Sequence, residues 1–278
     1  MLIVDSQVHI WGADTPQRPW PPGRAHAAQQ PHPVSKDMVL AEMDRAGVGR
    51  TVIVPPSWEG DHNDLALAAT RAHPDRFAVM GRIALERAQS RELVAGWKAQ
   101  PGMLGVRLTF HNEQQRPWLG DGTADWFWPA AERAGIPVMV FAPGRYAAFE
   151  GIAQRHPGLK LVLDHAGLDV TLRGAPAFED MATTCALARY PNVAVKASGM
   201  ACFSTELYPF RDVHAQIRRL VEAFGPQRAF WGTDLTRMKC SYRECVTLFT
   251  EEQPWLQGED LEWVMGRAVC DWLDWPLP

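Results

Sequence analysis

The sequence predicts one α/β domain folded as a (β/α)8 barrel (a TIM barrel), and three observations support this fold class. Eight short apolar runs recur along the 278 residues, and each is followed by an amphipathic helical segment. The runs are almost continuously hydrophobic, as expected of parallel strands buried on both faces. The chain length also fits, because a barrel of this kind typically needs ~250 residues.

The expected strands and helices alternate from one end of the chain to the other. We expect strands in the runs 2–10, 50–55, 76–83, 104–110, 137–142, 160–165, 193–198 and 229–234. The helical segments between them are MVLAEMDRAGV, NDLALAATRAHP, SRELVAGWKAQPG, ADWFWPAAERAGIP, YAAFEGIAQRHPG, FEDMATTCALARYP and RDVHAQIRRLVEAFGP, and SYRECVTLFTEE and GEDLEWVMGRAVCDWL follow the last strand. Ser35 is suited to cap the first helix and Gly47 to end it, and several later helices stop at Gly or Pro.

The segment after the first strand separates this fold from an open doubly wound sheet. That alternative usually carries a glycine-rich turn there, whereas residues 11–34 are a long, polar, Pro-rich loop. Loops of this length are usually functional or disordered. We interpret 11–34 as a capping loop over the barrel mouth, and 1–278 as a single domain without internal repeats.

Composition excludes several classes of partner and location. The net charge is -4 and no block of Lys or Arg occurs, which gives no reason to expect nucleic acid or a membrane as partner. Five cysteines without a C-x-x-C spacing argue against a disulfide framework and favour a reducing compartment. We see no signal peptide, and the apolar runs are far shorter than the ~20 residues that span a bilayer. We therefore expect a cytoplasmic enzyme that binds a small-molecule substrate, with a homo-oligomer left open.

Polar residues gather at the C-terminal ends of the expected strands, where barrels of this kind build their active sites. They are Gln7, His9, Arg107, Asp164, His165, Lys196, Ser198, Thr233 and Asp234. Burying ionisable groups is costly unless they are paired, bound to metal or functional. Several of them at one end of a barrel therefore indicate a catalytic site.

The motifs that carry these residues resemble the amidohydrolase superfamily. D-S-Q-V-H in the first strand, L-D-H-A-G in the sixth, V-K-A-S-G in the seventh and W-G-T-D in the eighth occur in the order and spacing of that superfamily. The chain is most similar to the amidohydrolase 2 branch, which includes 2-pyrone-4,6-dicarboxylate lactonase and sugar lactonases such as fuconolactonase. The resemblance implies a hydrolase that opens a lactone of a small carboxylated or sugar-derived substrate.

The resemblance also implies a divalent metal, but this chain departs from the metal-binding pattern. In the superfamily an H-x-H pair, a histidine of the sixth strand and an aspartate of the eighth surround the ion, and His9, His165 and Asp234 match three of these positions. Gln7 replaces the first histidine, the fourth strand offers Arg107, and the fifth strand has no histidine. Arginine stays charged and repels a nearby cation. We therefore expect that no metal is required, while zinc or manganese at low occupancy stays open.

We hypothesise that Asp234 is the general base for a water molecule, with its pKa raised by burial. His9 and His165 would polarise the carbonyl and stabilise the oxyanion. Arg107, whose planar guanidinium suits a carboxylate, would anchor the substrate. The remaining candidates for substrate binding are Gln7, Lys196, Arg145, Tyr146, Trp58 and Arg237.

Two other functions stay open at this point. A metal-dependent non-oxidative decarboxylase of the same branch would use a similar set of residues, with better strand-1 ligands than Gln-x-His. A non-catalytic barrel that binds a small molecule would explain Gln7 as a record of lost activity, although the joint retention of His9, His165 and Asp234 argues against it.

Overall fold

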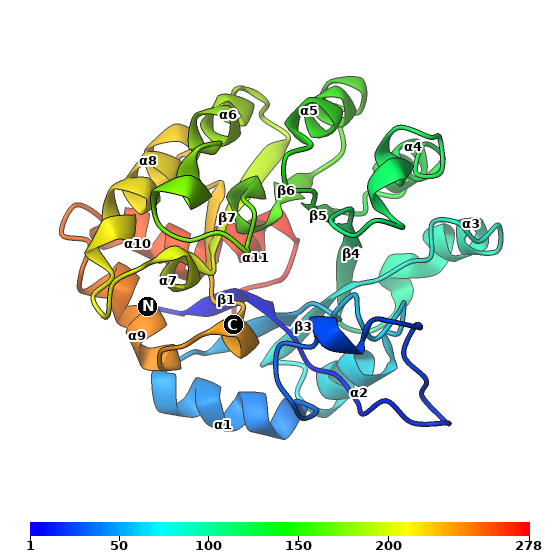
Figure 1. Cartoon of the computed structure of the whole chain (residues 1–278), viewed down its shortest axis with the longest axis horizontal. Coiled ribbons are helices and arrows are strands. Elements are labelled where there is room, and N and C mark those ends of the chain that lie inside the picture. Colours follow the sequence, from blue (N-terminus) through cyan, green and yellow to red (C-terminus); the bar gives the residue numbers. More distant parts are fainter.

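The chain folds as a nearly closed barrel of eight parallel strands with helices around it, as expected from the sequence. The computed structural model describes all 278 residues. The strands are β1 (Val4–Val8), β2 (Arg50–Ile53), β3 (Phe77–Gly81), β4 (Met103–Thr109), β5 (Val138–Phe141), β6 (Leu161–Leu163), β7 (Val193–Ser198) and β8 (Ala229–Gly232), hydrogen-bonded in sequence order. Figure 1 shows the strands at the centre and the helices outside them.

Apart from the short α7, which was not expected, the helices lie in the expected segments. They are α1 (Lys36–Ala46), α2 (Asp64–Ala72), α3 (Ser90–Leu93), α4 (Phe127–Arg133), α5 (Tyr146–Arg155), α6 (Met181–Ala186), α7 (Met200–Phe203), α8 (His214–Phe224), α9 (Tyr242–Thr250), α10 (Gly258–Glu262) and α11 (Ala268–Trp272). Ser35 caps α1 by accepting a hydrogen bond from the Met38 amide, and Gly47 ends it with a φ of 79°. None of the helices is both long and apolar enough to cross a membrane.

The barrel interior has an apolar floor and a polar layer above it. The floor contains Val52, Ala78, Met80, Met139, Val162, Ala194 and Phe230, and α11 packs beneath it. Side chains two residues apart on a strand point to the same side. Asp164 therefore follows Val162 inside the barrel, and Lys196 follows Ala194. A larger apolar cluster fills the space between the strands and the helices.

One backbone hydrogen bond and several side-chain contacts, rather than a regular ladder, join β8 to β1. The Asp234 amide donates to the Gln7 carbonyl at 2.8 Å, and the buried Asp5 carboxylate accepts hydrogen bonds from the Thr233 amide at 2.9 Å and the Tyr242 hydroxyl at 2.7 Å. A Cβ at Gly232 would come within 2.5 Å of Ser6 Oγ. A glycine is therefore needed where the two strands approach most closely.

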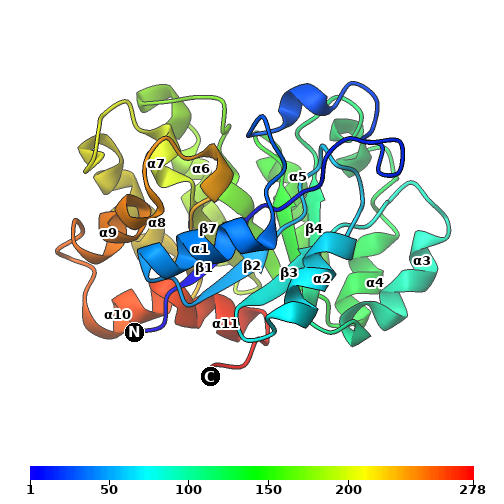
Figure 2. The ribbon, with the colours of Figure 1, turned by 90° about the horizontal axis from the view of Figure 1, so that it is seen from below.

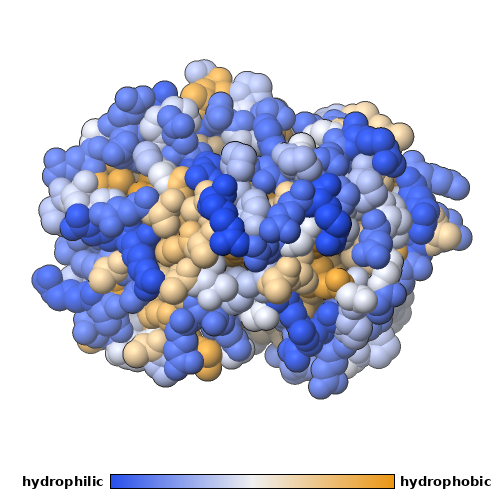
Figure 3. Space-filling model, turned by 90° about the horizontal axis from the view of Figure 1, so that it is seen from above, coloured by the Kyte–Doolittle hydropathy of each residue, from blue (hydrophilic) through white to orange (hydrophobic).

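The segment 11–34 lies at the end of the barrel opposite to the two termini (Figure 2). An isolated bridge between Trp11 and Val34 closes its base, and its only helical turn is η1 (Ala25–Ala27). Arg18 fastens it to Glu59 and Asp64 after β2. On the side of α5 and α6, hydrophilic side chains cover most of the outer surface, with smaller apolar patches between them (Figure 3).

Candidate active site

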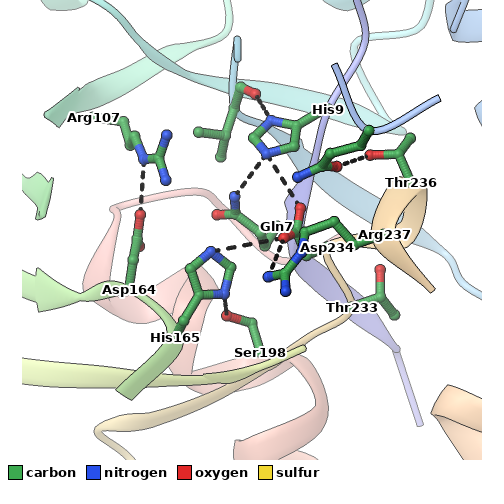
Figure 4. Close-up of polar contacts among 12 residues, drawn as sticks. Gln7, His9, Arg107, Asp164, His165, Ser198, Thr233, Asp234, Thr236 and Arg237 are labelled. Atoms are coloured by element: carbon green, nitrogen blue, oxygen red, sulfur yellow. Dashed lines mark hydrogen bonds and ion pairs between the residues drawn. The ribbon is translucent and has the colours of Figure 1, made fainter. Parts of the chain in front are cut away.

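Most polar side chains at the C-terminal ends of the strands lie in two groups, one around Asp234 and one around Asp164 (Figure 4). Lys196 joins the two groups, because it contacts both Asp164 and Gln7. At the centre of the first group is Asp234, which is 1 % exposed and directly precedes η8 (Leu235–Arg237). Its Oδ1 lies 3.2 Å from His9 Nε2, and its Oδ2 lies 3.9 Å from His165 Nε2. Arg237 Nη1 donates to the same Oδ2 at 3.2 Å. The structure thus brings His9, His165 and Asp234 together at the barrel mouth.

Two of these residues adopt a backbone conformation that is rare outside glycine. The φ angles are 51° for His165 and 58° for Asp234, both in the left-handed region. Each residue is the second after the end of its strand, His165 after β6 and Asp234 after β8. Non-glycine residues held in this region cost of order 1–3 kcal/mol and concentrate at functional sites. The turn directs each side chain back over the barrel mouth instead of along the strand.

Both histidines are oriented by their Nδ1 atoms. His9 Nδ1 lies 2.5 Å from the Val54 carbonyl, which can only accept, so this nitrogen carries a proton. His165 Nδ1 lies 2.9 Å from Ser198 Oγ at the end of β7. In each case Nε2 is left to face Asp234. A fixed partner at one ring nitrogen sets which nitrogen does the chemistry.

Lys196 and Arg107 form a second, fully buried set of charges around Asp164. Lys196 Nζ lies 2.9 Å from Asp164 Oδ1, and Arg107 Nε donates to Asp164 Oδ2 at 2.9 Å. Lys196 also donates to Gln7 Oε1 at 2.6 Å. Both Lys196 and Gln7 are completely buried. They hold the cluster in place from below, whereas Arg107 engages Asp164 through Nε alone and keeps its two Nη groups free of hydrogen bonds within the chain.

The charges around Asp234 overturn the expected direction of its pKa. Burial alone raises the pKa, as predicted from the sequence. The hydrogen bond with His9 and the charges of His9, His165 and Arg237 outweigh burial, and the pKa lies well below the ordinary value of an aspartate. The sequence prediction was wrong because it considered burial and not the contacts of the carboxylate, first with His9 and then with His165 and Arg237. Asp234 is therefore ionised at neutral pH.

Burial also decides the charge of His165. It lowers the pKa of His165 to about 4, against the opposing charges of Asp234 and Asp164. His165 is therefore neutral at pH 7. If Ser198 donates to its Nδ1, then Nε2 carries the proton and faces the space beside Asp234. A neutral imidazole in this tautomer is a hydrogen-bond donor for a carbonyl oxygen.

The low pKa of His165 predicts a loss of stability on acidification. In the unfolded chain a histidine titrates near 6.5, so between pH 4 and 6.5 the unfolded state binds more protons than the folded state. Stability from this group is therefore complete above pH 6.5 and lost as the pH falls towards 4. At pH 5 the expected loss is about 2 kcal/mol, since one pKa unit corresponds to about 1.36 kcal/mol.

Urea unfolding at pH 8, 6.5 and 5 measures this effect in the wild type and in His165→Asn. Asparagine tolerates the left-handed conformation of position 165, so the variant should fold and should show a shallower fall in the free energy of unfolding. His26→Asn, at an exposed position, is the control and should keep the wild-type slope. Equal slopes in His165→Asn and the wild type would contradict a buried neutral His165.

The donors around Asp234 do not fit a divalent metal as they lie. The types are suitable for zinc, since two imidazole nitrogens and a carboxylate are common ligands. However, Arg237 occupies Asp234 Oδ2, and the Gln7 amide nitrogen lies 3.4 Å from His9 Nε2. The structure has no group of three or more His, Cys, Asp or Glu side chains arranged to hold an ion. Arg107 and Lys196 would add further repulsion to a dication.

The other residues expected in the site divide into three kinds. Trp58 forms part of its wall, because its ring packs edge-on against His9 with centroids 5.4 Å apart. Tyr146 instead supports the backbone, since its hydroxyl donates to the Gly167 carbonyl at 2.8 Å below the turn η4 (Asp164–Gly167). Arg145 is exposed, and its side chain makes no hydrogen bond or ion pair. For Tyr146 and Arg145 the structure therefore gives no support to substrate binding.

Sequence reasoning missed one charged residue at the C-terminal ends of the strands, Arg82. Arg82 is 4 % exposed, and its Nε donates to Asp61 Oδ1 at 3.1 Å while its Nη1 is buried without a partner. It follows the buried Met80 by two positions, the same offset that separates Lys196 from Ala194. This two-residue offset from a buried strand residue was the sequence signal that could have identified Arg82. The half-buried His111 is close by, and burial followed by the charges of Arg107, Arg24 and Arg82 lowers its pKa to about 3.

Comparison with known proteins gives consistent matches over the whole chain. The family model described as Amidohydrolase matches residues 4–276. An L-fucono-1,5-lactonase of Burkholderia ambifaria is 27% identical over 241 residues, which cover 83% of this chain and 79% of that protein.

Two solved structures share the fold. An amidohydrolase of Burkholderia multivorans with bound zinc superposes with a TM-score of 0.79 at 23% identity, covering 99% of this chain and 100% of the other. A probable 2-pyrone-4,6-dicarboxylic acid hydrolase of Acinetobacter baumannii with bound citric acid has a TM-score of 0.77 at 18% identity, with the same coverage. At these identities the likeness shows the barrel and leaves the substrate open.

Proposed function

The chain belongs to the amidohydrolase family, and from this premise we propose that it hydrolyses a lactone of a small carboxylated or sugar-derived substrate. One observation carries the proposal. A buried, ionised Asp234 faces the Nε2 atoms of two histidines that are each oriented from behind. Such an arrangement supports hydrolysis, because an ionised carboxylate can accept a proton beside a histidine Nε2 that can donate to a carbonyl. The L-fucono-1,5-lactonase among the relatives supports a cyclic ester as the substrate.

In the proposed reaction Asp234 accepts a proton from a water molecule that attacks the lactone carbonyl. His165 Nε2, and His9 Nε2 when protonated, donate to the oxygen on which negative charge develops. The tetrahedral intermediate then breaks its ring C–O bond, and Asp234 returns the proton to the leaving oxygen. A low pKa keeps Asp234 ionised but makes it a weak base. The reaction therefore depends strongly on the donors that stabilise the oxyanion.

The charge balance favours a substrate that carries a carboxylate. Asp164 already has Arg107 and Lys196 as partners, and Asp234 has Arg237. The free Nη groups of Arg107 offer the fork geometry that a carboxylate prefers. We propose that residues 11–34 act as a cap over this site and that no metal is required. Because the amidohydrolase of Burkholderia multivorans has bound zinc, the expected independence from metal needs a direct test.

A panel of neutral and carboxylated lactones, each assayed with and without a chelator, tests the proposal. We expect ring opening, measured as acid release, with carboxylated lactones preferred through a lower KM and with activity unchanged by the chelator. Turnover of no lactone would overturn the proposal. Loss of activity on chelation, restored by zinc or manganese, would overturn the metal-independent mechanism, and release of carbon dioxide from a carboxylated substrate would identify a decarboxylase instead.

A further inference from the structure

A pair of cysteines lies at the start of α9, a few residues beyond Asp234. Cys240 Sγ and Cys245 Sγ are 3.5 Å apart. Cys240 is partly exposed and lines a groove of about 660 Å³ between α1 and the segment after β8, whereas Cys245 is buried. The mechanism proposed above uses neither thiol. No other pair of cysteines in the chain has its sulfur atoms in contact.

The local sequence explains why the two sulfur atoms meet. Ser241 is the N-cap of α9, and it forms a capping box with Glu244. In such a helix start the residue before the N-cap packs against the fourth helical residue, a contact called the hydrophobic staple. Here these two positions are Cys240 and Cys245. The capping box therefore holds both thiols in contact through ordinary helix geometry. Two apolar side chains would usually pack together at these positions, whereas two cysteines are also able to form a covalent bond.

The two thiols have different reactivity. The hydrogen bond from Cys245 lowers the pKa of Cys240, while the same hydrogen bond and then burial raise the pKa of Cys245 well above its ordinary value. The thiolate is the form that attacks an oxidant. Burial raises the pKa of the other three cysteines, Cys185, Cys202 and Cys270. Cys240 thus combines exposure, thiolate character and a neighbouring thiol.

We propose that Cys240 and Cys245 form a redox-active staple that a hydroperoxide converts reversibly into a disulfide. The Cys240 thiolate attacks one oxygen of hydrogen peroxide, an S–O bond forms, and the O–O bond breaks to release hydroxide. The Cys245 sulfur then attacks the Cys240 sulfur, the S–S bond forms, and the S–O bond breaks to release water. In total two thiols lose two electrons and two protons, and one hydrogen peroxide becomes two waters.

Peptide mapping of the full-length protein tests the proposal. Reduced protein is treated with hydrogen peroxide, free thiols are alkylated, and the chain is digested with trypsin. Cleavage after Lys239 and Arg243 separates the two cysteines, so a disulfide would join the peptides 240–243 and 244–267. We expect this linked pair to be the main oxidation product and dithiothreitol to release it.

Three variants make the result specific. Cys240→Ser and Cys245→Ser should each abolish the linked pair, and Cys245→Ser should stop at a sulfenic acid on Cys240, which dimedone traps. Cys185→Ser, which changes the other partly exposed cysteine, should behave as wild type. A main product that links Cys240 to Cys202, or oxidation of Cys185 as fast as Cys240, would overturn the proposal. If Cys245→Ser fails to fold, Cys240→Ser at the partly exposed position still decides.

Discussion

The Asp234→Asn variant is expected to keep its fold and to hydrolyse its lactone about 10²–10⁴-fold more slowly than the wild type, the range for loss of a general acid–base group. Asparagine matches aspartate in size but cannot accept the proton of the attacking water as a carboxylate does. It also tolerates the left-handed backbone of position 234 better than most residues. The expected loss of activity therefore falls on kcat, while the loss of the buried carboxylate paired with Arg237 lowers the melting temperature without preventing folding.

A matched control exists in the same chain. Asp274 also has a left-handed backbone, with a φ of 55°, but it lies at the opposite end of the barrel, where it pairs with Lys98 and Lys160. Asp274→Asn makes the same chemical change in the same conformation away from the site, and its kcat should equal that of the wild type. A kcat for Asp234→Asn within tenfold of the wild type would reject Asp234 as the base.

The fold was predictable because its signal repeats. Eight apolar runs separated by amphipathic segments leave few alternatives to a barrel, and the polar residues at the strand ends then share one side of it. The convergence of His9, His165 and Asp234 follows from this register alone. The family match is consistent with the same residues, since the resemblance depended on the motifs that contain them.

The chemistry of the site was less predictable, because it depends on where each side chain points beyond the end of its strand, which the strand pattern does not specify. The pattern places Asp234 after β8, but it does not say that contacts with His9, and less strongly with His165 and Arg237, hold the carboxylate in its ionised form. Similarly, Gln7 was expected to face substrate or water. Its side chain lies wholly buried against Lys196, so its role in this structure is to position the cluster.

Lys196→Met is expected to destabilise the fold by about 3–5 kcal/mol, the usual cost of removing one partner of a buried ion pair. Lys196 and Asp164 are both completely buried, and the charges of Lys196 and then Arg107 overcome burial to hold the pKa of Asp164 below its ordinary value. Without Lys196 the Asp164 carboxylate keeps only Arg107, and Gln7 Oε1 loses its donor. Chemical unfolding in urea measures the change.

Lys160→Met provides the comparison, because Lys160 also pairs with an aspartate at 2.9 Å but is exposed. Exposed pairs are typically worth less than 1 kcal/mol, so its cost should be several-fold smaller. Adding Asp164→Asn to Lys196→Met removes the unpaired charge, and the double variant should lose less than the sum of the two single losses. Additive losses would mean that Lys196 does not stabilise the barrel through Asp164. A raised KM together with wild-type stability in Lys196→Met would instead show that Lys196 binds the substrate.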